Sequence, residues 1–292
     1  MTDPQTLRAM ADRILELHET GRIEEALDAC HALLARAEAY DTGDEVVRES
    51  VFTARFELGV LHTELGDLRA AATAYEQAAR TPTDLDDPDQ RHELAMALLN
   101  TGICLAELGD TQEALRVYDQ LVVRLGDATD PVTVDQVTRA RVNRASAMLS
   151  LDRPSEALTV AEALAAELDP RDVLEAEQLA MATRLRAAAL RELGRVAEAA
   201  DALAEVERCT DEDSASRQQV AAAQVDRAEL LRELGREDEA VEVLERAERR
   251  FAGDPDPGVG EIVIDLLRTE AEMLERRGEH DRAAELRQRV HG

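Results

Sequence analysis

Lysine and tryptophan are absent from this chain of 292 residues, and aromatic side chains make up only 2% of it. A phosphate-binding loop of the GxxxxGK type requires lysine, so that class of nucleotide site is excluded. With so few rings, a core must consist mainly of Leu, Val and Ala, as in packed helices. Because 45% of the residues are hydrophobic, the chain can bury such a core, and wholesale disorder is excluded.

Long apolar runs are also missing. No stretch of about 18 uncharged apolar residues occurs, and the first residues, MTDPQTLRAM, lack the basic start and apolar segment of a secretion signal. The three cysteines, Cys30, Cys104 and Cys209, are odd in number and far apart, which indicates reduced, partly buried thiols. The sequence therefore predicts a soluble cytoplasmic protein with no membrane partner.

Negative charge dominates the composition. All 34 basic residues are arginine, which is typical of a GC-rich bacterial genome, and they are outnumbered by 63 acidic residues. The resulting net charge of −29 repels phosphate backbones, so a nucleic-acid partner is disfavoured.

Motifs for catalysis or cofactor binding are missing as well, since the chain has no GxGxxG, GxSxG, HExxH or CxxC sequence. The six histidines form no pair of metal ligands at helical spacing, and His62 is expected to be a partly buried structural residue. The acidic run 84–89 lacks the spacing of an EF-hand, so helix capping and solvation explain it. We therefore predict no enzyme activity, no metal and no cofactor.

The chain does contain one short phrase repeated seven times, with copies such as ETGRIEEAL, ELGDTQEAL and ELGREDEAV. A glycine that follows a helix adopts the left-handed conformation without a Cβ penalty, and Asp tolerates it better than most residues. Each phrase therefore predicts the turn of an antiparallel helix hairpin. The turn residues are 41 to 45 positions apart: Gly21, Gly66, Gly109, Asp152, Gly194, Gly235 and Gly278.

Small residues recur at two places, numbered here relative to the turn residue. Place +5 is alanine in every copy, and place −7 is Gly59, Gly102, Ala145, Ala187, Ala228 or Ala271 in all copies but the first. Small side chains at these places let the two helices of a hairpin approach closely. Larger residues stand at place +9 in four copies: Tyr75, Tyr118, Leu203 and Leu244.

This combination of small residues, glycine turn, alanine and following aromatic resembles the tetratricopeptide repeat (TPR). The closest copy is LLNTGICLAELGDTQEALRVYDQLV, and the resemblance covers essentially the whole chain. Usual repeats have about 34 residues, so these are longer, and the longer form is similar to repeats of kinesin light chains and of large bacterial signalling regulators. The resemblance implies an all-α fold, a right-handed superhelical solenoid of seven helix hairpins in a single domain spanning residues 1–292.

Acidic connectors that contain proline separate the copies. The Asp-Pro pairs at 130–131 and 169–170 predict N-capped helices with proline in the first turn. In the last copy, Arg287 stands where earlier copies have Tyr or Leu, and a polar outer face is what a terminal capping repeat needs. The chain is therefore expected to be complete.

In TPR proteins the first helix of each hairpin lines a concave groove, and the resemblance assigns places −10, −6 and −3 to it. Carried over to this sequence, these places give an apolar stripe in copies two to four and arginines in copies five and six. The candidate partner-binding residues are Phe56, Val60, Leu99, Ile103, Val142, Leu149, Arg184, Arg191 and Arg232.

We hypothesise that an amphipathic helix or extended peptide binds with its apolar face on the stripe and an acidic end on the arginines. The alternative is that the longer helices bury these residues between repeats. Chaperone C-termini are not expected partners, because that subgroup of the family uses Lys and Asn in the groove, and here lysine is absent and place −6 is never Asn.

The predicted function is a non-enzymatic scaffold for protein–protein interaction. Two alternatives remain open at this point. One is a regulator that senses a peptide or small ligand, and the other is a structural protein that assembles with itself into a homo-oligomer.

Overall fold

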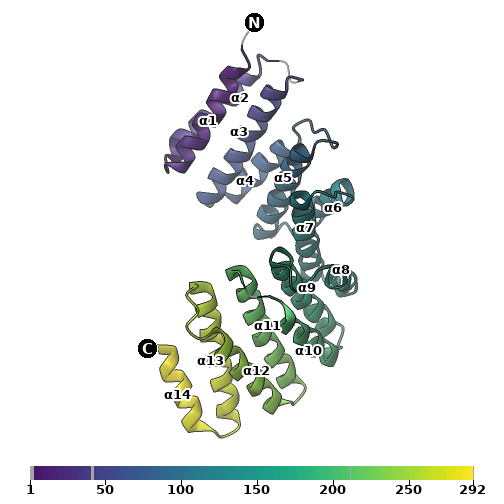
Figure 1. Cartoon of the computed structure of the whole chain (residues 1–292), viewed down its shortest axis with the longest axis vertical. Helices are drawn as coiled ribbons and strands as arrows, with labels where there is room; N and C mark the ends of the chain where they lie inside the picture. The colour runs from purple at the N-terminus through teal and green to yellow at the C-terminus, as the bar shows by residue number, and fades with distance from the viewer. Residues whose placement is uncertain (1–2, 41–42, 211, 292) are drawn as a thin grey trace. The chain divides into compact units, whose positions relative to one another are not determined.

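The computed structural model describes residues 3–40, 43–210 and 212–291, which form fourteen α-helices and one 3₁₀ helix (Figure 1). It divides into two compact units, unit 1 (Met1–Ala147) and unit 2 (Met148–Gly292), and the boundary falls within α7. The prediction of a single domain over 1–292 stays a prediction. No helix in the described ranges is long and apolar enough to cross a membrane.

Unit 1 contains three complete helix hairpins, α1–α2, α3–α4 and α5–α6, followed by α7. The first helix of the second and third hairpins has 20 residues, as the long repeats predict. The helices are α1 (Gln5–Glu19), α2 (Ile23–Ala37), α3 (Glu45–Glu64), α4 (Leu68–Ala79), α5 (Pro88–Glu107), α6 (Thr111–Leu125) and α7 (Pro131–Ser150).

Unit 2 begins with α8 and continues with the hairpins α9–α10, α11–α12 and α13–α14. Its helices are α8 (Pro154–Glu167), α9 (Val173–Glu192), α10 (Val196–Ala204), η1 (Glu205–Arg208), α11 (Ser214–Glu233), α12 (Glu237–Phe251), α13 (Pro257–Arg276) and α14 (His280–His291). The all-α prediction is confirmed for the described residues.

All seven predicted turn residues have a positive φ, between 57° at Asp152 and 81° at Gly109. In each copy the amide of the next residue donates to the carbonyl four residues before the turn, as Asp110 does to Leu105 at 2.9 Å and Arg153 to Met148 at 2.9 Å. This is the Schellman arrangement, which satisfies carbonyls that the helix end leaves without partners. The turn prediction is therefore confirmed in every copy.

The close approach within two hairpins depends on glycine at place −7. A Cβ built on Gly102 would lie 2.3 Å from the Tyr118 ring, and one on Gly59 would lie 2.5 Å from the Tyr75 ring. The tyrosines stand at place +9, so each ring lies directly on the glycine backbone. Copies five and six have Ala at −7 and Leu at +9, which distributes a similar volume over the same two places.

The helix starts confirm one capping prediction and correct the other. Asp130 accepts a hydrogen bond from the Thr133 amide at 2.9 Å, and Pro131 is the first residue of α7. Pro170, in contrast, lies before α9 begins at Val173, and Asp172 accepts from the Glu175 amide at 3.3 Å. In the acidic run 84–89, Asp87 accepts from the Asp89 and Gln90 amides, which confirms its capping role.

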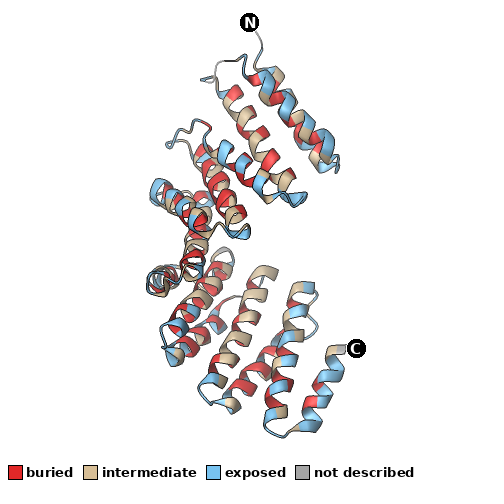
Figure 2. Cartoon of the chain, turned by 180° about the vertical axis from the view of Figure 1, so that it is seen from behind, coloured by how far each residue is buried: buried red, intermediate tan, exposed pale blue. Residues whose placement is uncertain are grey.

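Buried residues lie on the sides of the helices that face other helices, and exposed residues gather at the turns (Figure 2). The predicted burial of Cys30, Cys104 and Cys209 is confirmed. Burial raises the pKa of Cys30 to about 12 and that of Cys209 to about 11. These thiols are therefore protonated and unreactive at neutral pH.

Replacing Gly102 by Ala should destabilise the protein by about 1–3 kcal/mol, because the added methyl group overlaps the Tyr118 ring. Elsewhere in a helix the same change stabilises by about 0.5–1 kcal/mol, so the expected sign is opposite to the ordinary one. Urea denaturation followed by circular dichroism measures the difference. The double variant Gly102→Ala/Tyr118→Leu should recover most of the loss, as the Ala–Leu pairs of copies five and six indicate; a fully additive loss would contradict this contact.

Candidate functional site

The face formed by the first helices of the repeats is the candidate site. The structure places the nine predicted residues on α3, α5, α7, α9 and α11, but it exposes them unequally. Leu99 is only 3% exposed and Val142 only 1%. Their assignment to a surface groove is corrected, because at place −10 in these copies the side chain points into the packing between helices.

Phe56 is half-buried for the same reason. Its ring stacks on Phe52 with centroids 5.7 Å apart and meets the edge of Tyr75 at 5.2 Å. Phe52 and Phe56 also belong to a buried cluster with Ala97 of α5. Phe56 therefore joins two hairpins and offers only part of its ring to a partner.

Place −6 remains partly open in unit 1. Leu15 is 39% exposed, and Val60 and Ile103 are half-buried. Val60 packs on the cluster that contains Cys104 of α5, so the second and third hairpins are in contact here. Leu15, Val60 and Ile103, which we call the apolar ridge, thus occupy equivalent places on α1, α3 and α5. Leu15 stands at place −6 of the first copy and was not among the nine candidate residues.

Two of the three predicted arginines are engaged in unit 2. The Arg184 guanidinium lies 2.7 Å from the Asp226 carboxylate and 2.9 Å from Gln219, both on α11. Arg191 forms an ion pair with Glu233, also on α11. These two side chains therefore connect successive first helices, and they are not free cations for an acidic partner.

Arg232 differs from Arg191, although both stand at place −3. Arg191 pairs with place −2 of the next copy, where Glu233 stands, whereas in the last copy place −2 is Arg276. Neither Arg232 nor Arg276 has an ion-pair partner among the residues that the structure describes. Leu149, the remaining predicted residue, is half-buried near the end of α7 in unit 2.

The same type of connection occurs in unit 1. Arg8 of α1 lies 2.6 Å from Glu49 of α3, and Arg48 of α3 lies 2.6 Å from Glu93 of α5. The side chain of Arg48 is only 10% exposed, so this ion pair is screened less by solvent than the others. Arginine is suited to such connections because its planar group donates in several directions at once.

His18 joins the first two hairpins through two carboxylates. Its ring nitrogens lie 2.8 Å from Glu57 and 2.9 Å from Glu64, both on α3, and its side chain is 23% exposed. The hydrogen bond with Glu64, followed by that with Glu57, raises the pKa of His18 against the opposing effect of burial. His62 is half-buried, as expected of a structural histidine.

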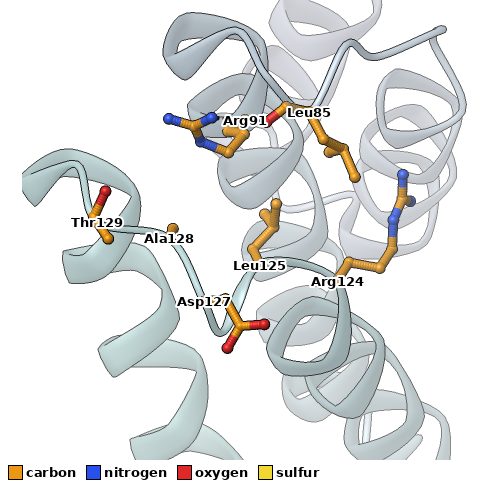
Figure 3. A pocket seen from close by; sticks show the side chains of 7 residues that line it. All are labelled: Leu85, Arg91, Arg124, Leu125, Asp127, Ala128 and Thr129. Carbon is orange, nitrogen blue, oxygen red and sulfur yellow. Dashed lines mark hydrogen bonds between the residues drawn. The ribbon is translucent and has the colours of Figure 1, made fainter.

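A small cavity of about 200 Å³ lies beside the connectors of unit 1, and Figure 3 shows the seven side chains that line it. Arg91 is already engaged there, since it donates to the Leu85 carbonyl at 2.7 Å and lies 3.0 Å from Asp130. The described part of the chain holds no group of three or more His, Cys, Asp or Glu residues arranged for a metal ion. We therefore take the first-helix face as the candidate site.

Consecutive helix hairpins, each closed by a left-handed turn, define a helical repeat protein. Models of the tetratricopeptide repeat match residues 12–87, 96–124 and 213–255. The chain belongs to the tetratricopeptide repeat proteins, with repeats of 41 to 45 residues. No curated protein matches its sequence.

Several solved structures share the fold over nearly the whole chain. A Rap protein complexed with Competence and Sporulation Factor is 13% identical, with a TM-score of 0.51 and coverage of 99% of this chain and 97% of its own. The apo form of RapI is 9% identical, with a TM-score of 0.59 and coverage of 96% and 94%. The apo form of the quorum sensor NprR from B. thuringiensis is also 9% identical, with a TM-score of 0.59 and coverage of 99% and 88%.

His18 should stabilise the protein in a pH-dependent way. Because its folded pKa is raised above the ordinary value of 6.5, the stabilisation is present below pH 6.5 and is lost as pH rises through the folded pKa. His18→Gln should therefore lower the free energy of unfolding by about 1 kcal/mol near pH 6 and by less at pH 9. Urea denaturation at both pH values tests this, with His31→Gln, an exposed histidine, as the control. Equal losses at both pH values would contradict the ion-pair role.

Proposed function

We propose that this protein is a non-enzymatic interaction scaffold that binds a peptide or helix of a partner protein along the apolar ridge. The observation that carries the proposal is the ridge itself: three partly exposed aliphatic side chains at equivalent places on α1, α3 and α5. Place −6 in copies four to seven holds Ser146, Ala188, Glu229 and Glu272 instead, so the apolar character is confined to unit 1.

The neighbouring residues support a binding role for the ridge. At place −3 the same helices carry Thr63 and Ala106, which are uncharged, and His18, which is paired with Glu57 and Glu64. The protein has a net charge of −29, so an apolar strip on its surface is unusual. Apolar side chains on such a strip favour contact with a partner over contact with water. An amphipathic helix suits such a strip, because its apolar face can contact the three ridge residues one after another.

A second patch, which suits an acidic group of a partner, is formed by Arg232 and Arg276. They stand at neighbouring places on α11 and α13, where an arginine–glutamate pair stands on α9 and α11. A carboxylate of a partner could bind both guanidinium groups and so supply the acid that Glu233 supplies to Arg191. This second patch lies in unit 2 and is proposed independently of the ridge.

Affinity capture from the native cytosol tests the ridge. A protein retained by the wild type should be lost with Val60→Asp/Ile103→Asp, because each change places a charge in the apolar contact. The control is Val123→Asp, since Val123 on α6 is 84% exposed and lies outside the first-helix face. All three proteins are first compared by circular dichroism. Retention by the ridge variant, or equal loss with the control, would contradict the proposal.

Charge removal at the second patch should act only on an acidic partner. Arg232→Gln/Arg276→Gln should weaken the binding of an acidic partner about threefold to tenfold, and the effect should fall with added salt. Arg124→Gln, an exposed arginine on α6, is the control for net charge. Calorimetry at two salt concentrations measures the difference. An unchanged affinity would remove this patch from the proposal.

A peptide-sensing regulator is the second candidate, because the fold is shared with a Rap protein complexed with Competence and Sporulation Factor and with the quorum sensor NprR. Small-angle scattering of the protein with its captured ligand separates the two functions: a sensor changes its radius of gyration on binding, whereas a rigid scaffold keeps it. If the wild type captures only itself, the homo-oligomer alternative replaces both.

A further inference from the structure

At place −8 the last repeat has an acidic residue where other repeats have a basic one. This place is arginine in copies one, four, five and six, and in copies four and six the side chain pairs with an acid on the preceding repeat. Arg144 lies 2.6 Å from Asp119, which is place +10 of that repeat, and Arg227 lies 2.8 Å from Glu207, which is place +13. In the last copy, place −8 is Glu270 instead.

The residues of the preceding repeat that face place −8 are still acidic in the last copy. Places +10 and +13 of the preceding repeat are Glu245 and Glu248 on α12, so three carboxylates meet where copies four and six have an arginine against an acid. Two arginines of α14 compensate in part. Arg282 lies 2.6 Å from Glu245, and Arg289 forms an ion pair with Glu248.

Glu270 itself remains poorly satisfied. It is only 3% exposed, its Oε2 atom has no hydrogen-bond partner, and its Oε1 atom lies 4.0 Å from the Arg282 guanidinium. Burial, followed by the charges of Glu245 and Glu248, raises the pKa of Glu270 to about 7. An ionised carboxylate in this position needs a further donor, because a buried charge without one is costly.

Space for such a donor lies beside the carboxylate. A cavity of about 250 Å³ is lined by Glu245, Glu248, Arg249, Glu270, Arg282, Glu285, Leu286 and Arg289. These residues belong to α12, α13 and α14, and apart from Glu270 the charged ones lie on the second helices of the last two repeats. The cavity is therefore separate from the apolar ridge, which lies on first helices of unit 1.

We propose that this cavity binds the guanidinium group of an arginine side chain from a partner protein, with Glu270 as the buried acceptor. The bound group would take the role that Arg144 and Arg227 have in their own repeats, opposite acids at the same places. A guanidinium group suits the cavity because it is planar and offers several donors to carboxylates that surround it. The lining carries four carboxylates and three arginines, so one added cation balances the charge when Glu270 is ionised.

Isotope-edited NMR of the full chain tests the proposal with N-acetyl-arginine amide as the probe and N-acetyl-citrulline amide, which has the same shape without the charge, as the matched ligand. Arginine should give saturable shifts at α12, α13 and α14, with a Kd of roughly 1 mM as for a single polar anchor. Binding should be stronger at pH 8 than at pH 6, because Glu270 must be ionised to accept the guanidinium group. The charged groups that face Glu270 from the lining are Glu245, Glu248, Glu285, Arg249, Arg282 and Arg289.

Two variants decide whether Glu270 is the acceptor. Glu270→Gln should weaken binding by about tenfold or more, since the buried charge is lost, and it should fold because it removes an unpartnered carboxylate. Glu270→Arg, which gives this place the arginine of copies four and six, should abolish binding and raise Tm. Glu261→Gln, an exposed change on α13, is the control and should bind as the wild type does. Equal shifts with citrulline, or unchanged binding by Glu270→Gln, would overturn the proposal, as would the absence of saturable shifts with arginine.

Discussion

The contact between place −7 of a first helix and place +9 of its partner sets the geometry on which the rest of the structure depends. Where the first place is glycine, in copies two and three, a tyrosine ring lies on the backbone, and in copies five and six alanine at the first place is matched by leucine at the second. The left-handed turn residue and its two closing hydrogen bonds bring these places together in every repeat. Close packing of this kind leaves little freedom in how the two helices cross.

Once the hairpins are fixed, arginines decide which surfaces remain free. Arg8, Arg48, Arg184 and Arg191 each extend to an acid on the next first helix, so much of the positive charge of this acidic chain is used inside the protein. The surfaces available to partners are those whose residues are not engaged in these ion pairs. The apolar ridge in unit 1 and the pair Arg232 and Arg276 in unit 2 are such places, and they carry the proposed function.

The turns and the small residues beside them could be predicted from the sequence because they are local features. A left-handed turn depends on residues within five positions, so even Asp152 was identified correctly. The burial of Leu99 and Val142 could not be predicted in this way, because it depends on how one hairpin packs against the next. Pro170 was placed wrongly for a local reason, because a second aspartate, Asp172, stands directly before α9 and caps it instead.

The ion pairs of the arginines are partly predictable from the sequence and partly dependent on the structure. Glu233 and Arg276 stand at the same place in successive repeats, and that difference is visible in the sequence, but its meaning depends on Arg191 contacting place −2 of the next helix. Glu270 is similar. Its exchange with arginine at place −8 is plain from the repeats, yet only the structure shows the carboxylates of Glu245 and Glu248 beside it. Repeat comparison finds such departures, and geometry decides which of them matter.

Transplanting the glycine–tyrosine pair into the fifth repeat tests the central contact most directly. Ala187 and Leu203 occupy places −7 and +9 there, and both are buried. Unfolding free energies of Ala187→Gly, Leu203→Tyr and the double variant form a double-mutant cycle. We predict that each single change destabilises the protein and that the pair recovers about 1–3 kcal/mol through coupling. Additive losses would show that the two places do not determine how the hairpin packs, and would contradict the account.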